Sequence, residues 1–149
     1  LAEEAATRDS KLVLTLHAPS GPGNRSQTIR YAEQAKTCFT SLMEAFEEAG
    51  LPICVALELN RFKGQADPCT SYVGVLDIVE AVDHPRLGIC WDMGHNHANH
   101  LRGLCPPLPT NRFLDRIVHT HIHGFVGGRF LGERDAQRER KTVDLGAKK

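Results

Sequence analysis

The sequence lacks a net charge, because 18 aspartate and glutamate residues balance its 18 lysine and arginine residues. No overall electrostatic field therefore draws the chain toward nucleic acid or an anionic membrane surface, although a local basic patch remains compatible with this balance. No apolar run approaches the roughly 18 residues that a membrane span requires, and no secretory signal peptide is visible. We therefore expect a cytoplasmic protein that has no membrane partner and for which nucleic acid is an unlikely ligand.

Paired cysteine motifs are also missing. The five cysteines are odd in number and form no C-x-x-C pair, and two of them, Cys54 and Cys90, lie inside apolar runs. This pattern favours reduced, partly buried thiols over a disulfide framework.

The chain does contain four short apolar runs, each with the length and composition of a strand. They cover residues 11–17, 52–59, 86–92 and 116–123. With 149 residues, of which 41% are hydrophobic, the chain is large enough for one domain with a core. We assign residues 1–126 to this domain and 127–149 to a charged segment that is disordered or lies on the surface. Residues 1–9 resemble the end of a helix already under way, so we expect a piece of a longer chain.

Helical patterns separate these runs. Apolar residues recur at helical spacing over residues 26–49, before Gly50. A second helix begins after Thr70 or Ser71 and must end before Pro85, and a short helical piece covers residues 110–116. Strands that alternate with helices predict βαβ units and a parallel sheet.

Alternation within each strand favours a barrel over an open sheet, because residues two apart share a face. One face is large and apolar and suited to packing under helices: Leu12, Leu14, Leu16, Val55, Leu57, Leu59, Leu87, Ile89, Trp91, Val118 and Ile122. The other face is small or polar: Val13, Thr15, Cys54, Ala56, Gly88, Cys90, Ile117 and His119. An open doubly wound sheet would need two apolar faces. The pattern therefore predicts an α/β (β/α)8 TIM barrel of which about four βα units are present.

Each polar face ends, at the carboxyl tip of its strand, in a side chain able to bind a metal. These side chains are His17, Glu58, Asp92 and His121, with His123 beside the last. A single histidine at a strand end is more often a core or surface residue, but four successive tips at one end indicate a site. Mixed carboxylate and imidazole ligands suit a divalent ion such as Mn²⁺, Co²⁺, Mg²⁺ or Zn²⁺.

Three stretches resemble motifs of the xylose isomerase-like barrel superfamily. They are "LELN", "GICWDMGH" and "VHTHIHG", and the resemblance extends over residues 11–125. This superfamily includes sugar-phosphate isomerases and epimerases and the endonuclease IV-type enzymes. The resemblance implies an eight-stranded barrel whose last strand supplies a further glutamate ligand. The four runs of this chain hold no counterpart of that strand.

The resemblance also implies roles for individual residues. Asp92 would be a metal ligand, Glu58 both a ligand and the acid/base, and His95 a contact to substrate or to a further metal. The second histidine of an H-x-H pair commonly ligates, which leaves His121 and His123 as alternatives. We prefer His121 and assign His123 to substrate binding, although glycine at 124 stands where aspartate is usual and keeps both registers open.

The function implied is that of a metal-dependent sugar or sugar-phosphate isomerase or epimerase. A metal would polarise the carbonyl of a hydroxy-ketone or aldehyde, and Glu58 would remove the neighbouring proton to form an enediolate. His17 and His95 would hydrogen-bond the substrate oxygens.

Two alternatives stay open. An endonuclease IV-type zinc phosphodiesterase would use His17 and His95 as ligands, and His97 and His100 add imidazoles nearby, although we expect these two to be ordinary loop or helix residues. An inactive barrel fragment is the other alternative. Because four βα units leave open sheet edges, a homo-oligomer of half-barrels is a further expectation.

Overall fold

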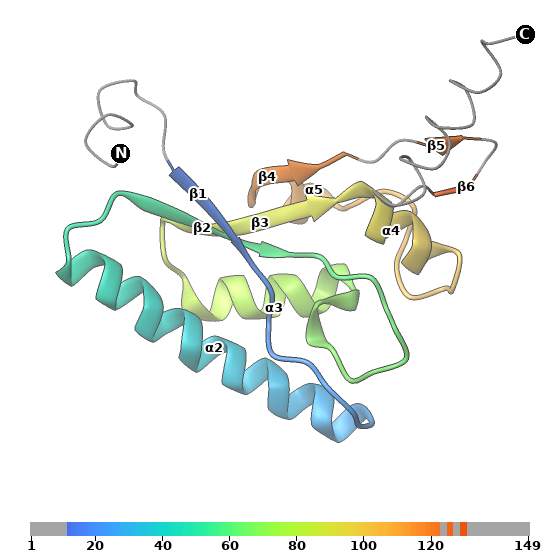
Figure 1. Ribbon diagram of the computed structural model, residues 1–149, viewed down its shortest axis with the longest axis horizontal. Coiled ribbons are helices and arrows are strands. Elements are labelled where there is room, and N and C mark those ends of the chain that lie inside the picture. Colours follow the sequence, from blue (N-terminus) through green and yellow to red (C-terminus); the bar gives the residue numbers. More distant parts are fainter. Residues whose placement is uncertain (1–11, 123–124, 127–128, 131–149) are drawn as a thin grey trace, which may run out of the picture.

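Four parallel strands form the central sheet, in the spatial order β1–β2–β3–β4 (Figure 1). They are β1 (Leu12–Leu16), β2 (Ile53–Glu58), β3 (Leu87–Asp92) and β4 (Ile117–His121). Each lies within one of the four predicted runs, and every neighbouring pair is parallel, as predicted. The sheet curls into a half-barrel, which confirms the partial TIM-barrel prediction.

The computed structural model describes residues 12–122, 125–126 and 129–130. A short antiparallel pair, β5 (Phe125–Val126) with β6 (Arg129–Phe130), follows the sheet. The predicted helix end at residues 1–9, His123 and most of the predicted charged segment at 127–149 lie outside the described residues.

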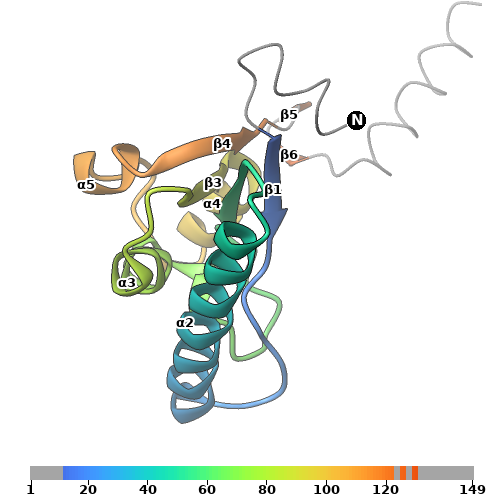
Figure 2. The same ribbon diagram turned by 90° about the vertical axis from the view of Figure 1, so that its left-hand side faces the viewer.

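Helices α2 (Arg25–Glu48) and α3 (Tyr72–Val82) cover one face of the sheet (Figures 1 and 2). The Asn24 side chain caps α2 by accepting a hydrogen bond from the Ser26 amide at 3.0 Å. Of the two predicted caps of α3, Ser71 is the one used, because its hydroxyl accepts from the Gly74 amide at 3.2 Å. Three shorter helices lie in the described part of the chain: η1 (Pro68–Thr70), α4 (Met93–His100) and α5 (Asn111–Leu114).

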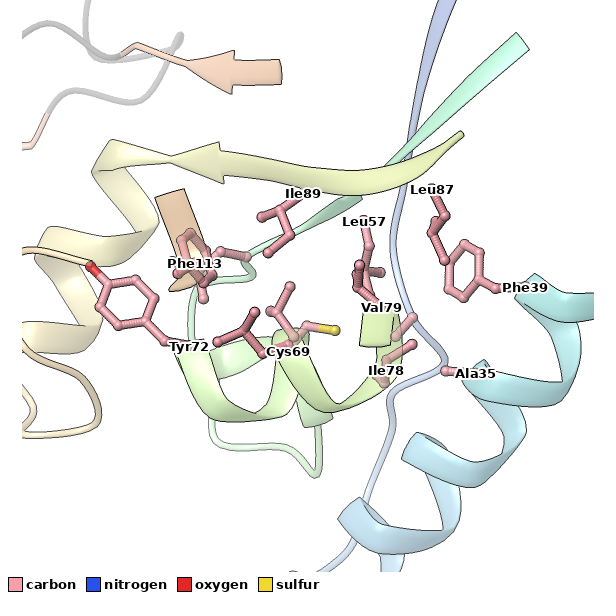
Figure 3. Close-up of a cluster of buried hydrophobic side chains, with 14 of the residues drawn as sticks. Ala35, Phe39, Leu57, Cys69, Tyr72, Ile78, Val79, Leu87, Ile89 and Phe113 are labelled. Carbon is pink, nitrogen blue, oxygen red and sulfur yellow. The ribbon is translucent and has the colours of Figure 1, made fainter. Parts of the chain in front are cut away.

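The hydrophobic core lies between this face of the sheet and the helices (Figure 3). Leu57 and Ile89 from the strands pack there with Phe39 of α2, Val79 of α3 and Phe113 of α5. Each of the five is at most 4% exposed, and burying a side chain of this size contributes roughly 1.5–3 kcal/mol. The core fixes the backbone from which the strand tips project.

The predicted apolar face is buried on β2 and β3 but not along the whole of β1. Trp91 packs against the core as predicted, as does Leu16. Leu12 and Leu14 are 55% and 39% exposed, so the prediction that they pack under helices is wrong. Among the described strands, β1 pairs with β2 alone and so lies at the edge of the sheet, while α2 and α3 pack over its middle.

Strand β4 departs from regular alternation. Ile89 pairs with Ile117, whereas the next residue, Cys90, pairs with His119, so Val118 is an extra residue in β4. Ile117 packs against the core. The prediction that Ile117 and His119 share a face is therefore wrong, because the bulge changes the side to which the strand directs its residues.

Val118 is the residue that this bulge places against β3. A Cβ atom built on Gly88 would lie 2.5 Å from Cγ1 of Val118, so glycine is what allows the close approach. The prediction that Val118 packs under helices is accordingly wrong. Ile122, at the end of the same predicted face, is 77% exposed.

All five cysteines are free, and four of them, including Cys54 and Cys90, are buried, in agreement with the prediction. Within the described part of the chain, no helix is long and apolar enough to cross a membrane.

Candidate metal and active site

The carboxyl ends of the four strands lie at one edge of the sheet, on the side where α4 begins (Figure 1). Glu58 and Asp92 are the last residues of β2 and β3, His121 is the last of β4, and His17 directly follows β1. The bulge in β4 restores alternation before its end, so that His121 pairs with Asp92. The structure thus brings together the four strand-tip residues that the sequence singled out.

Glu58, Asp92 and His121 each offer a donor atom, and these atoms all lie within 4.8 Å of one another. His121 Nδ1 is 3.5 Å from Glu58 Oε1 and 3.5 Å from Asp92 Oδ2. Two donors that are each about 2.1 Å from one ion at a tetrahedral angle lie about 3.4 Å apart. The spacing and the oxygen and nitrogen donors therefore suit a divalent cation.

The two oxygens of Asp92 have different partners. Oδ1 accepts a hydrogen bond from the His95 amide at 2.7 Å and so caps the N-terminus of α4, while Oδ2 faces His121. Helix α4 was not predicted. Its signal in the sequence is Asp92 itself, since aspartate is a favoured N-cap residue and the amide that it binds lies three positions later in the chain.

The carboxylate of Glu58 is divided in a similar way. Oε1 lies 3.2 Å from His95 Nδ1 and 3.5 Å from His121 Nδ1, whereas Oε2 lies 2.9 Å from His17 Nε2. The Glu58 side chain is 6% exposed, but that of His17 is 62% exposed. One oxygen thus belongs to the donor cluster, and the other is connected to solvent through His17.

Glu58 is ionised at neutral pH. Burial alone would raise the pKa of its carboxyl group, but hydrogen bonds from His95 and His17, with the charges of His17 and His121, outweigh burial and lower the pKa to about 2. An ionised carboxylate is the form that binds a cation and the form that can accept a proton.

His95 lies beside the cluster with its Nδ1 atom surrounded by acceptors. This atom is 3.0 Å from the carbonyl oxygen of Leu59, 3.2 Å from Glu58 Oε1 and 3.4 Å from Asp92 Oδ2. Because a carbonyl oxygen can only accept, Nδ1 carries the hydrogen. Burial by itself would lower the pKa of His95, but these acceptors raise it. A contact from His95 to a substrate or a metal would have to use Nε2.

A second group of possible ligands shares His121. Cys90, His119 and His121 also offer donor atoms within 4.8 Å of one another. Burial is the largest cause that raises the pKa of Cys90, to about 12, so without a cation it is a neutral thiol. This group was not predicted, because the bulge that pairs Cys90 with His119 has no signal in the spacing of the residues.

His97 and His100 lie on α4, consistent with the expectation that they are ordinary loop or helix residues. His100 Nδ1 is 3.1 Å from the carbonyl oxygen of Cys105, which ties the end of the helix to the following loop. Neither histidine belongs to a group of possible metal ligands among the described residues.

A buried network of polar side chains behind the site was also missed by sequence reasoning. Asn99 is fully buried, donates to the carbonyl oxygens of Asn60 at 2.7 Å and Thr70 at 2.9 Å, and accepts from the Phe62 amide at 2.9 Å. Asn60 in turn donates to Asp67 at 3.0 Å. This network joins α4 to the loop that follows Glu58. Only the polar residues within otherwise buried segments hint at it.

Comparison with known proteins places this geometry in a wider context. A family model described as "Xylose isomerase-like TIM barrel" matches residues 2–142. Two proteins named "Probable endonuclease 4", from Mesomycoplasma hyopneumoniae strain 7448 and strain J, are each 28% identical over 97 residues, which are 61% of this chain and 34% of theirs.

A solved structure has the same fold. The crystal structure of a D-tagatose 3-epimerase-like protein matches with a TM-score of 0.59 and 23% identity, over 82% of this chain and 44% of that one. The chain therefore spans about a third of the length of these curated relatives and less than half of that structure.

Proposed function

The chain belongs to the xylose isomerase-like TIM-barrel family, and from this premise we propose that it contributes the metal site of a sugar or sugar-phosphate isomerase or epimerase. The observation that carries the proposal is the divided carboxylate of Glu58. One oxygen lies in the donor cluster and the other is hydrogen-bonded to an exposed histidine. The fold of the epimerase-like structure supports the same class of reaction.

Glu58, Asp92 and His121 would hold a divalent ion, and such an ion acts as a Lewis acid on the carbonyl of a hydroxy-ketone. Three protein donors leave room for substrate oxygens around it. We keep Mn²⁺, Co²⁺, Mg²⁺ and Zn²⁺ as candidates. His123, which lies outside the described residues, keeps its proposed role in substrate binding.

Glu58 Oε2 would remove the proton next to the carbonyl. With a pKa of about 2, this carboxylate is a weak base, so the reaction requires a substrate proton that has first been made acidic. His17, at 2.9 Å from Oε2 and largely exposed, can pass the proton to solvent. The side chain of His95 can stabilise the oxygen on which negative charge develops.

Deuterium exchange tests the proposal. The protein is incubated with D-tagatose and MnCl₂ in D₂O, and ¹H NMR follows the signal of the hydrogen bonded to the carbon next to the carbonyl. We expect loss of that signal with the wild-type chain and none with Glu58→Gln, which keeps the shape but cannot accept the proton. Glu44→Gln, an exposed change on α2, is the matched control. Equal exchange in wild type and Glu58→Gln would refute the role of Glu58.

A zinc phosphodiesterase is the second candidate, because the curated relatives carry the name endonuclease 4. The Cys90, His119 and His121 donors offer places for a further zinc ion. Elemental analysis separates the candidates. About one Mn or Co per chain supports the isomerase, two or three Zn with cleavage of an oligonucleotide at an abasic site support the nuclease, and an intact fold without metal supports an inactive fragment.

We also propose a cytoplasmic location, in keeping with five free cysteines, and association of half-barrels through their open edges. Leu12 and Leu14 on the edge strand β1 are exposed and available for such a contact. Size-exclusion chromatography that gives a clean monomer would contradict the association.

A further inference from the structure

A cavity of about 420 Å³ lies beside the loop that follows β2. Its walls are formed by Arg61, Phe62, Lys63 and Gly64 of that loop and by Arg102, just after α4. Three of these five residues carry a positive charge and none carries a negative one. The whole chain has balanced charges, so this is a local concentration of cations and not part of a general basic surface.

In the part of the chain that the structure describes, no carboxylate lies within ion-pair distance of these three cations. The ion pairs found there involve other basic residues, such as Lys36 with Asp77 and Arg112 with Glu80. At longer range, the charge of Lys63 acts on the carboxyl group of Asp67 and partly offsets the rise in its pKa that burial causes. Three cations gathered around one cavity repel each other unless an anion lies among them. The arrangement is therefore that of an anion site, with two guanidinium groups able to bind phosphate oxygens in pairs.

The cavity is held in place by the buried network behind it. Asn99 of α4 accepts from the Phe62 amide at 2.9 Å and so fixes the loop against the helix whose end leads to Arg102. Gly64 has a φ of +81°, a conformation that side chains rarely adopt, which allows the turn within the loop. Both walls of the cavity are thus positioned by the fold before any ligand binds.

The cavity also lies close to the proposed metal site. Arg61 follows Glu58 by three residues, so their Cα atoms are at most about 11 Å apart. His95, on the same helix as Asn99, contacts both Glu58 and the carbonyl oxygen of Leu59. A ligand that binds both places would carry a carbonyl at one end and an anionic group at the other.

We infer that the substrate is a phosphorylated sugar whose phosphate binds in the cavity formed by Arg61, Lys63 and Arg102. This inference rests on the proposed function, whose site it extends, and it selects sugar phosphates over free sugars. A phosphate group matches the cavity in charge, and a nucleic-acid backbone would need further cations in a row beyond this single cluster.

Calorimetric titration of the full chain in low-salt buffer with MnCl₂ tests the inference. The probes are D-fructose 6-phosphate, D-fructose and a 15-base-pair DNA duplex. We expect tighter binding of the phosphorylated sugar than of the free sugar by at least tenfold. The combined variant Arg61→Gln, Lys63→Gln and Arg102→Gln should remove this difference and leave the affinity for D-fructose unchanged.

The matched control is Arg116→Gln, which removes a cation before β4, at the opposite end of the strand from the site. Its contact with Asp83 is long, at 3.8 Å, and exposed, so its loss costs little. The control should bind D-fructose 6-phosphate as the wild type does. Circular dichroism of each variant checks that the fold is intact, which is expected because the three cavity cations are exposed.

Three results would overturn the inference. They are equal affinity of the wild type for D-fructose and D-fructose 6-phosphate, unchanged phosphate affinity in the triple variant, or binding of the duplex that is tighter than that of the sugar phosphate and lost in that variant. Failure of the proposed function is seen separately, as absence of Mn²⁺ binding or of deuterium exchange with a free ketose.

Discussion

Replacing Asn99 with alanine should weaken the protein more than any single exposed change. The side chain is fully buried and makes three hydrogen bonds, to the carbonyl oxygens of Asn60 and Thr70 and to the amide of Phe62. Alanine leaves two acceptors and one donor without these partners. Each unsatisfied buried group costs about 1–3 kcal/mol, but water can reach some of them once the side chain is gone. We therefore expect a loss of about 3–5 kcal/mol, a large part of the 5–15 kcal/mol typical of a folded domain.

Equilibrium unfolding in urea, followed by circular dichroism, measures this loss. The control is Gln34→Ala on the exposed face of α2, which should change the free energy of unfolding by less than about 0.5 kcal/mol. A loss below about 1 kcal/mol in Asn99→Ala would refute the reasoning. It would mean that the loop after β2 is not held by this side chain, and the fixed position of the basic cavity would lose its support.

Three further predictions concern the site and the sheet. In metal-free protein, the lowered pKa of Glu58 stabilises the fold by about 3 kcal/mol at pH values above 4.5, the pKa in the unfolded chain. This contribution is lost as pH falls from 4.5 toward 2. Midpoints of urea unfolding measured across this range should therefore fall less steeply in Glu58→Gln than in the wild type. His121→Ala should lower Mn²⁺ affinity at least tenfold by calorimetry, while His97→Ala on α4 should leave it unchanged. Unchanged affinity in His121→Ala would favour His123 as the ligand instead. Gly88→Ala should cost about 1–3 kcal/mol in urea, because its Cβ would overlap the Val118 side chain and the carbonyl oxygen of Arg116. Adding Val118→Ala should recover the part that is due to Val118, and no recovery would show that the Val118 side chain is not the cause.

The arrangement of the strand tips could be predicted from the sequence because it follows from two local regularities. Side chains alternate along a strand, and parallel strands end at the same edge of a sheet. Glu58, Asp92 and His17 obey both, so their positions in the chain were enough to bring them together. Local patterns also predicted α2 and α3, because their apolar residues recur at helical spacing and their ends carry capping residues.

The features that the sequence did not predict depend on contacts between segments that are distant in the chain. The bulge in β4 arises where Val118 packs over Gly88, 30 residues earlier, and no local pattern records that approach. His121 nevertheless lies beside Glu58 and Asp92, as expected, because the extra residue precedes it and regular pairing resumes before Asp92. Asn99 and the basic cavity were missed for the same reason, since they join α4 to a loop almost 40 residues away.

Helix α4 connects the two parts of the proposed substrate site, the donor cluster and the basic cavity. Asp92 fixes α4 with one oxygen and faces the donor cluster with the other, and α4 holds the loop of the basic cavity through Asn99. The donor cluster lies on strands that pack against the core, whereas the cavity lies on a loop whose hydrogen bonds to α4 come from Asn99. A perturbation of Asn99 should therefore reach the cavity before the cluster. If a carbonyl is bound by the strands and a phosphate by the loop, Asn99→Ala should lower the affinity for D-fructose 6-phosphate several-fold more than the affinity for Mn²⁺. Equal losses of both would instead indicate that the loop and the strand tips form a single unit.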